Sequence, residues 1–331
     1  MTIEAREINN LALCDPLRQR LVFPIRESYF PLGFALEVRT NDTRVLEAAR
    51  RSFCGFGKQF EGKPVRVDLG VAGESDSLPE NTIYRARGHL LSIVCDAANF
   101  AVVDLNEGSA FGWINEGVAQ QTDWLRHRFL EAIVYSCLCQ TRVTPVHASC
   151  IGRNGKCLLL CGRSGAGKTS LAYACARDGW DYLGDDAVYL MGEGPGQVLL
   201  GKPYSIRFDD TAVELFPELD GQPRTRDAQG CLRIEMDPRE TGGITVSEQC
   251  AVGGVVFLDR REGAQALLSG VDPEEAGRRL LADLPVYEET TVARHRRSIE
   301  WLVGSAGCRQ LTYSGFPQAI RELNLLLDGQ S

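Results

Sequence analysis

The stretch CGRSGAGKTS, residues 161–170, combines glycine, lysine and hydroxyl side chains at a spacing suited to binding phosphate. Gly162, Gly167, Lys168 and Thr169 satisfy the pattern GxxxxGK[ST] in full. The pattern follows an apolar run at 157–161 and precedes a helical run, so it predicts a strand, a phosphate-binding loop and a helix in that order. The alternative is a plain glycine turn, which would not require Lys168 and Thr169 together.

Each residue type in this stretch has a physical role in such a loop. Glycines let consecutive backbone N–H groups turn toward phosphate oxygens, and the helix N-terminus adds unpaired donors. We expect Lys168 to contact the β- and γ-phosphates and the Thr169 hydroxyl to coordinate Mg²⁺. The residues expected to bind the nucleotide are Gly162, Ser164, Gly165, Ala166, Gly167, Lys168, Thr169 and Ser170.

Two adjacent carboxylates, Asp185 and Asp186, are expected to return to this loop. A helix from Lys168 to Asp178 would span roughly 16 Å, and six extended residues after it would cover about 20 Å in return. If the doublet lies on a strand, its two side chains point to opposite faces, so one can approach a metal ion and the other an acceptor hydroxyl. A GDD turn at the surface is the alternative.

A histidine is predicted to lie across a hairpin from the loop. Asn154 and Gly155 indicate a two-residue turn between two apolar runs, and the resulting register places His147 opposite Gly162. There His147 can contact phosphate or orient the aspartates. It can equally be an ordinary hydrogen-bonded strand residue.

The remaining sequence predicts two domains around these residues, because 331 residues exceed the usual size of one hydrophobic core. Residues 1–140 are predicted to form a small α+β domain, with acceptor recognition as a candidate role. Residues 141–331 contain the loop, and the boundary is expected near 140–143. The fold class expected is α/β, in the sense of mixed α+β. The elements expected in the first domain are strands at 34–38, 65–71, 90–94 and 100–105 and helices at 41–53 and 123–139.

Composition excludes several classes of protein. Hydrophobic residues make up 44% and charged residues 24%, and the sequence lacks the run of roughly 18 apolar residues that crosses a membrane. Residues 1–20 lack the features of a signal peptide, so we expect a cytoplasmic protein whose 12 cysteines are free thiols. The net charge of −8 argues against a nucleic-acid-binding protein.

Taken together, these motifs resemble the HPr kinase/phosphorylase family. The matching residues are His147 with Ala148, the stretch GRSGAGKTS, and GWDYLGDDAVYL with its aspartate doublet. The resemblance implies an ATP-dependent kinase acting on a serine hydroxyl, with a P-loop core related to that of phosphoenolpyruvate carboxykinase. It also implies that relatives often assemble, so a homo-oligomer is among the expected partners, although the sequence identifies no interface.

The resemblance assigns roles to individual residues. Lys168 would bind phosphate, Thr169 and Asp186 would hold Mg²⁺, Asp185 would be the catalytic base and His147 an auxiliary residue of the site. An arginine from a later strand would complete the site. The candidates are Arg207 in KPYSIRF and then Arg233 in CLRIE, with surface strand arginines as the alternative.

Two departures from the family pattern bear on function. The family loop usually ends in serine, and Thr169 keeps the hydroxyl group. The glycine-rich RG-x-G stretch of the bifunctional members is missing, where this chain has CLRIEMDPRETGGI instead. This weakens the case for the reverse, dephosphorylating activity and for a carrier protein as substrate.

The function expected is therefore an ATP- and Mg²⁺-dependent kinase that transfers the γ-phosphoryl group to a serine or other hydroxyl on a peptide, protein or small molecule. The alternative is a non-catalytic module that senses ATP. An ATPase coupled to motion is a weaker interpretation, because the sequence shows us neither a Walker-B strand further along the chain nor a residue to position water.

Overall fold

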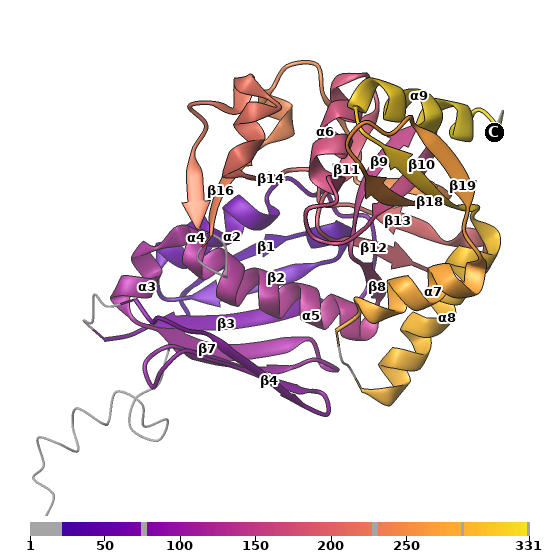
Figure 1. The fold of residues 1–331 in the computed structure, drawn as a ribbon. Helices are drawn as coiled ribbons and strands as arrows, with labels where there is room; N and C mark the ends of the chain where they lie inside the picture. The colour runs from indigo at the N-terminus through magenta and orange to yellow at the C-terminus, as the bar shows by residue number, and fades with distance from the viewer. Residues whose placement is uncertain (1–21, 74–77, 227–230, 286–287, 330–331) are drawn as a thin grey trace, which may run out of the picture. The chain divides into compact units, whose positions relative to one another are not determined.

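The computed structural model describes residues 22–73, 78–226, 231–285 and 288–329. The fold is mixed α/β with several sheets, and the chain divides into two compact units that meet in sequence at Thr141 and Arg142. The first unit is drawn in indigo to magenta and the second in magenta to yellow in Figure 1. The prediction about a signal peptide concerns residues 1–20, which lie outside the described residues.

The first unit is built on a seven-stranded sheet with the order β1-β2-β3-β7-β6-β5-β4. The β2–β3 and β3–β7 pairs are parallel, and the other neighbours are antiparallel. The strands are β1 (Ile25–Tyr29), β2 (Leu36–Thr40), β3 (Val65–Val71), β4 (Ile83–Arg87), β5 (Leu90–Val94), β6 (Phe100–Asp104) and β7 (Ser109–Ile114).

Helices of the first unit pack through apolar side chains at helical spacing. In α2 (Thr43–Phe53), Val45, Leu46, Ala49 and Phe53 are buried, and Asp42 caps the N-terminus by accepting a hydrogen bond from the Arg44 N–H. The helix predicted at 123–139 extends further in both directions and contains a π-helical turn. Its parts are α4 (Thr122–Leu125), the π-helical turn Arg126–Leu130 and α5 (Glu131–Thr141), preceded by α3 (Glu116–Gln120).

The second unit contains a ten-stranded sheet. Its main path runs β17-β11-β9-β10-β18-β13-β12-β8, and β20 pairs with both β18 and β19. The strands are β8 (Val143–Val146), β9 (Ala148–Arg153), β10 (Lys156–Cys161), β11 (Asp181–Gly184), β12 (Val188–Met191), β13 (Val198–Leu200), β17 (Thr245–Val246), β18 (Gln249–Arg260), β19 (Leu267–Gly270) and β20 (Cys308–Tyr313).

Helices cover both faces of this sheet because side chains of β10 alternate between two cores. Leu158 and Leu160 pack with α6 (Lys168–Arg177) and α9 (Phe316–Leu327), whereas Leu159 packs with α7 (Pro273–Ala282) and α8 (Glu289–Ser305). A separate three-stranded sheet has the order β14-β16-β15. Its strands are β14 (Ile206–Asp209), β15 (Arg224–Arg226) and β16 (Leu232–Met236).

The predicted hairpin of the second unit is confirmed. Asn154 and Gly155 have φ angles of 53° and 77°, as a tight turn between antiparallel strands requires. The pairs run from Arg153 opposite Lys156 to Ala148 opposite Cys161. His147 therefore comes directly before the last pair, and Gly162 directly after it.

Strand direction brings several segments to one edge of the sheet. Since β11 and β10 are each antiparallel to β9, they are parallel to each other, and β18 and β20 run the same way. The carboxyl ends of these four strands therefore share one edge, which we call the loop edge. In parallel α/β sheets, ligands bind at this kind of edge.

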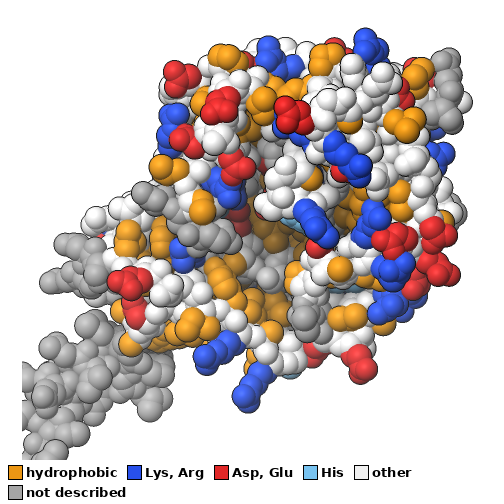
Figure 2. Space-filling view, in the orientation of Figure 1, with side chains coloured by type: hydrophobic (Ala, Val, Ile, Leu, Met, Phe, Trp, Pro, Cys, Tyr) orange, Lys and Arg blue, Asp and Glu red, His pale blue; other side chains and the backbone are white. Residues whose placement is uncertain are grey.

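The structure bears on three expectations drawn from the composition: membrane-spanning helices, the state of the cysteines and the distribution of charge. No helix in the described part of the chain is long and apolar enough to cross a membrane. The 11 cysteines in that part are free thiols. On the face drawn in Figure 2, acidic and basic side chains are interspersed among apolar ones.

Candidate functional site

The glycine loop, residues 162–167, connects β10 to α6 at the loop edge, and the strand and helix predicted on either side are confirmed. Gly162, Gly165 and Gly167 have φ angles of 157°, 79° and 89°. A Cβ on Gly167 would lie 2.8 Å from the Tyr313 hydroxyl oxygen. A larger residue there would meet backbone strain and a steric clash together.

The other predicted nucleotide ligands lie along the loop and the first helical turn. Ser164 is exposed, and the Ala166 carbonyl accepts a hydrogen bond from the Tyr313 hydroxyl at 3.3 Å. Thr169 and Ser170 are partly exposed and follow Lys168 in the first turn of α6. Their hydroxyls therefore lie beside the free N–H groups of a helix N-terminus, where anions bind.

Lys168 points back across the loop. It is 8% exposed, and its Nζ donates to the carbonyls of Gly162 at 2.7 Å and Arg163 at 3.4 Å. Its third contact is His147 Nε2 at 3.0 Å. Burial lowers the pKa of Lys168, and the nearby Asp186 carboxylate opposes that shift.

His147 links Lys168 to the aspartate doublet. The lysine ammonium can only donate, so Nε2 of His147 accepts and the ring proton lies on Nδ1. Nδ1 then donates to the Asp186 carbonyl at 2.8 Å, and it also lies 3.5 Å from the Asp186 carboxylate. The His147 ring thus bridges Lys168 and Asp186 and fixes their relative positions.

Asp185 is the buried member of the doublet, with 8% exposure. Its carboxylate accepts a hydrogen bond from the Arg207 backbone N–H at 3.1 Å. Burial raises the pKa of Asp185 to about 6, although the Arg207 N–H bond and the charges of Arg207 and Lys202 oppose the rise. With this pKa, Asp185 is mostly deprotonated at pH 7 and is a stronger base than an ordinary carboxylate, which favours general-base catalysis.

The doublet lies in a turn, as in the alternative interpretation, and not on a strand, although Asp185 is buried and not at the surface. The strand β11 ends at Gly184, and Asp186 has a left-handed backbone with a φ of 61°. The Asp186 side chain is 75% exposed while Asp185 is buried, so the turn separates the two carboxylates as strand pleating would have done. Left-handed non-glycine residues are strained and occur often at functional sites.

The donors proposed for Mg²⁺ suit that ion chemically. Mg²⁺ prefers hard oxygen ligands and keeps several waters. The Thr169 hydroxyl and the exposed Asp186 carboxylate supply such oxygens at the loop edge, and the exposure of Asp186 leaves room for water.

The two candidate arginines have different positions. Arg207, on β14, reaches Asp185 through its backbone N–H, and its Nε lies 3.9 Å from Glu235 Oε1. Arg233 lies on β16 opposite Asp209, with which it forms an ion pair. The geometry therefore places Arg207, and not Arg233, directly against the doublet.

Three residues near the site were not singled out from the sequence. Lys202 follows β13 and comes close to β11, because Gly201 lacks a Cβ that would otherwise lie 2.0 Å from the Leu183 carbonyl oxygen. Tyr313 and Arg260 end β20 and β18 and lie against Gly167. For Lys202, the sequence did offer a signal, because a Gly-Lys pair follows an apolar run there.

The interpretation that no Walker-B strand follows further along the chain is wrong, because the structure contains an apolar strand with an acidic end. Residues 255–258 of β18 are buried beside β10, and Asp259 follows them at the loop edge. Asp259 pairs with Arg261 at 2.7 Å and accepts from Gln310 at 3.2 Å. The run VVFLD was visible in the sequence, but its pairing with β10 was not.

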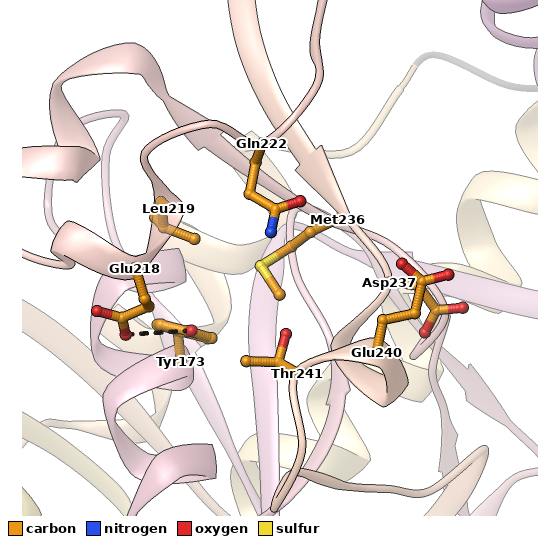
Figure 3. Close-up of a pocket in the computed structure, with 8 residues that line it drawn as sticks. All are labelled: Tyr173, Glu218, Leu219, Gln222, Met236, Asp237, Glu240 and Thr241. Carbon is orange, nitrogen blue, oxygen red and sulfur yellow. Dashed lines mark hydrogen bonds between the residues drawn. The ribbon is translucent and has the colours of Figure 1, made fainter.

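A small cavity of about 90 Å³ lies beside the second turn of α6 (Figure 3). Glu218, Asp237 and Glu240 contribute carboxylates to its lining, and Glu218 accepts a hydrogen bond from Tyr173 at 3.3 Å. None of the predicted site residues lines it. This cavity is therefore separate from the glycine loop.

Neither the protein-family models nor the curated proteins contain a match. Among solved structures, the chain is similar to the HPr(Ser) kinase/phosphatase from Coxiella burnetii, with 12% sequence identity and a TM-score of 0.33. That alignment covers 56% of this chain and 96% of the other. The structural relationship is distant.

Proposed function

We propose that the protein is an ATP- and Mg²⁺-dependent phosphotransferase that acts on a hydroxyl group. The observation that carries the proposal is the hydrogen-bonded set of Lys168, His147 and Asp186 at the loop edge, with the buried carboxylate of Asp185 next to it in the chain. A pure nucleotide-binding module has no need of a buried carboxylate with a raised pKa beside the loop.

In this proposal Asp185 is the catalytic base. Its carboxylate takes the proton of the acceptor hydroxyl as the oxygen attacks the γ-phosphorus. One bond forms between that oxygen and phosphorus, the bond to the β–γ bridging oxygen breaks, and ADP leaves with the electron pair. Asp185 then releases the proton to solvent. The Arg207 N–H orients the carboxylate throughout.

The glycine loop and Lys168 supply the charge stabilisation. When phosphate binds, the ammonium group exchanges its carbonyl partners at Gly162 and Arg163 for phosphate oxygens. His147 keeps Lys168 close to the doublet and acts as a positioning residue. Thr169 and Asp186 would hold Mg²⁺, which neutralises charge on the β- and γ-phosphates when bound.

We assign acceptor recognition to the first unit. Five large apolar side chains on one face of its sheet are 40–47% exposed: Ile83, Leu90, Val94, Val102 and Phe111. Exposed apolar side chains gathered on one sheet face, here interspersed with Arg85, Arg87 and Ser92, are typical of an interaction site. A peptide or protein acceptor is accordingly favoured over a small metabolite.

The proposal is tested by incubating the full chain with γ-labelled ATP, Mg²⁺, a serine-centred peptide library and a panel of hydroxyl metabolites. We expect label in at least one acceptor, and none with Lys168→Ala. Lys156→Ala is the matched control, because Lys156 begins β10 at the end away from the loop. ATP binding without transfer to any acceptor or to water would favour the ATP-sensing alternative.

A further inference from the structure

A groove of about 420 Å³ lies between α6 and α9. Ala174, Arg177 and Asp178 form one wall and Phe316, Ile320 and Asn324 the other. The two helices neighbour each other in the second unit, as Figure 1 shows. None of the predicted phosphate or metal ligands lines this groove.

The α6 wall of the groove leads back to the glycine loop. Ser170, Ala174 and Arg177 are spaced by four and three residues, so they form one stripe along the helix. Ser170 is the last predicted phosphate ligand, and Asp178 lies about 12 Å further along the helix axis. A group attached to phosphates at the loop can therefore follow this stripe into the groove.

The α9 wall is also tied to the loop. The Arg260 side chain lies 3.8 Å from where a Cβ of Gly167 would be, and its guanidinium lies over the Phe316 ring, 5.5 Å from the ring centre. The ring of Phe216 stacks on Phe316 at 5.6 Å with an interplanar angle of 10°. Phe316 is partly exposed and lines the groove, where it supports the Arg260 guanidinium and is itself backed by a second ring.

We infer that this groove binds the nucleoside part of the nucleotide, with the base stacked on the Arg260 guanidinium that lies over the Phe316 ring. The inference rests on the proposed function, because it requires the phosphates to bind at the glycine loop. Aromatic rings and arginine planes both stack on bases. The groove thereby makes the site prefer a nucleoside triphosphate over inorganic tripolyphosphate.

The test measures Mg²⁺-dependent binding of ATP and of inorganic tripolyphosphate to the full chain by calorimetry. Phe316→Leu removes the aromatic surface but keeps an apolar side chain against Phe216. We expect it to weaken ATP binding about tenfold and to change tripolyphosphate binding less than about twofold. The separate variant Phe316→Trp, which keeps an aromatic ring, should bind ATP like wild type. Leu325→Ala, at an exposed position of α9 outside the groove, should affect neither ligand.

A second measurement uses the unaltered protein and does not depend on any variant folding. Hydrogen exchange of the α9 amides from Phe316 to Asn324 should slow with ATP but not with tripolyphosphate. Equal effects of Phe316→Leu on both ligands, or equal protection of α9 by both, would overturn the inference alone. Failure of the wild-type chain to bind either ligand would overturn the proposed function and this inference with it.

Discussion

Asp185 is the residue on which the proposed chemistry depends most. Its burial disfavours the charged form and raises its pKa to about 6. A base must be deprotonated, so we expect kcat/KM to fall below pH 6 and to level off above about pH 7. The measurement is a pH–rate profile of label transfer. A profile without an acidic limb between about pH 5 and 7 would contradict the assignment.

The same burial predicts a change in stability. The folded-state pKa of Asp185 lies about 2 units above its ordinary value of 3.8, so ionisation destabilises the fold by about 3 kcal/mol. This loss of folding stability is absent below pH 4, where Asp185 is protonated in both states, and is complete well above pH 6. Asp185→Asn keeps an acceptor for the Arg207 N–H and removes the buried charge.

Urea unfolding should therefore show Asp185→Asn to be more stable than wild type at pH 8, by up to about 3 kcal/mol, and nearly equal to it at pH 4. Asp181→Asn provides the control, since Asp181 begins β11 away from the loop and is partly exposed. An equal effect of Asp185→Asn at both pH values would show that its charge is not destabilising.

At the scale of elements, the glycine loop must fit between α6 and the end of β20. Gly167→Ala would place a methyl group against the Tyr313 hydroxyl in a left-handed backbone, and we expect it to abolish ATP binding. Gly179→Ala is matched, because Gly179 has a φ of 87° after the same helix but open space around it.

Calorimetry with ATP measures the loss of binding, and thermal unfolding measures the loss of stability from backbone strain. Both variants should lose about 1 kcal/mol of stability through backbone strain. Gly179→Ala alone should still bind ATP like wild type. If Gly167→Ala also bound ATP normally, the tight fit of the loop against Tyr313 would not be needed for ATP binding.

Sequence periodicity predicted the local elements well. The strands at 65–71 and 90–94 and the β9–β10 register match the structure, because alternation and an Asn-Gly turn are encoded by adjacent residues. The strand predicted at 34–38 begins at Leu36 instead, after a 3₁₀ turn at Pro31–Gly33.

Contacts set by tertiary packing were harder to predict. The pairing of β18 with β10 joins segments about 95 residues apart, and periodicity carries no information about such a partner. The bond from the Arg207 backbone N–H to Asp185 likewise leaves no mark in residue type. The motifs identified which residues to consider, and the parallel strands explain why they meet.

At the scale of the whole molecule, every predicted site residue falls in the second unit, so nucleotide binding should stabilise that unit by mass action. At a free ATP concentration 100 times Kd, with Mg²⁺ in excess, the gain should be about 2.7 kcal/mol. Thermal unfolding with and without Mg²⁺ measures it. Asp186→Asn should lose the Mg²⁺-dependent part of this gain and Asp181→Asn should keep it. If the Mg²⁺-dependent gain in stability were equal in the two variants, Asp186 would not be a ligand of Mg²⁺.

The central claim is that a buried carboxylate at the loop edge takes the proton from a hydroxyl acceptor. The most direct test is single-turnover transfer from γ-labelled ATP to an acceptor from the peptide library, with ATP affinity measured in parallel. We predict that Asp185→Asn binds ATP within about twofold of wild type and transfers at least about 100-fold more slowly. Asp181→Asn should match wild type in both. Transfer by Asp185→Asn at the wild-type rate would contradict the account.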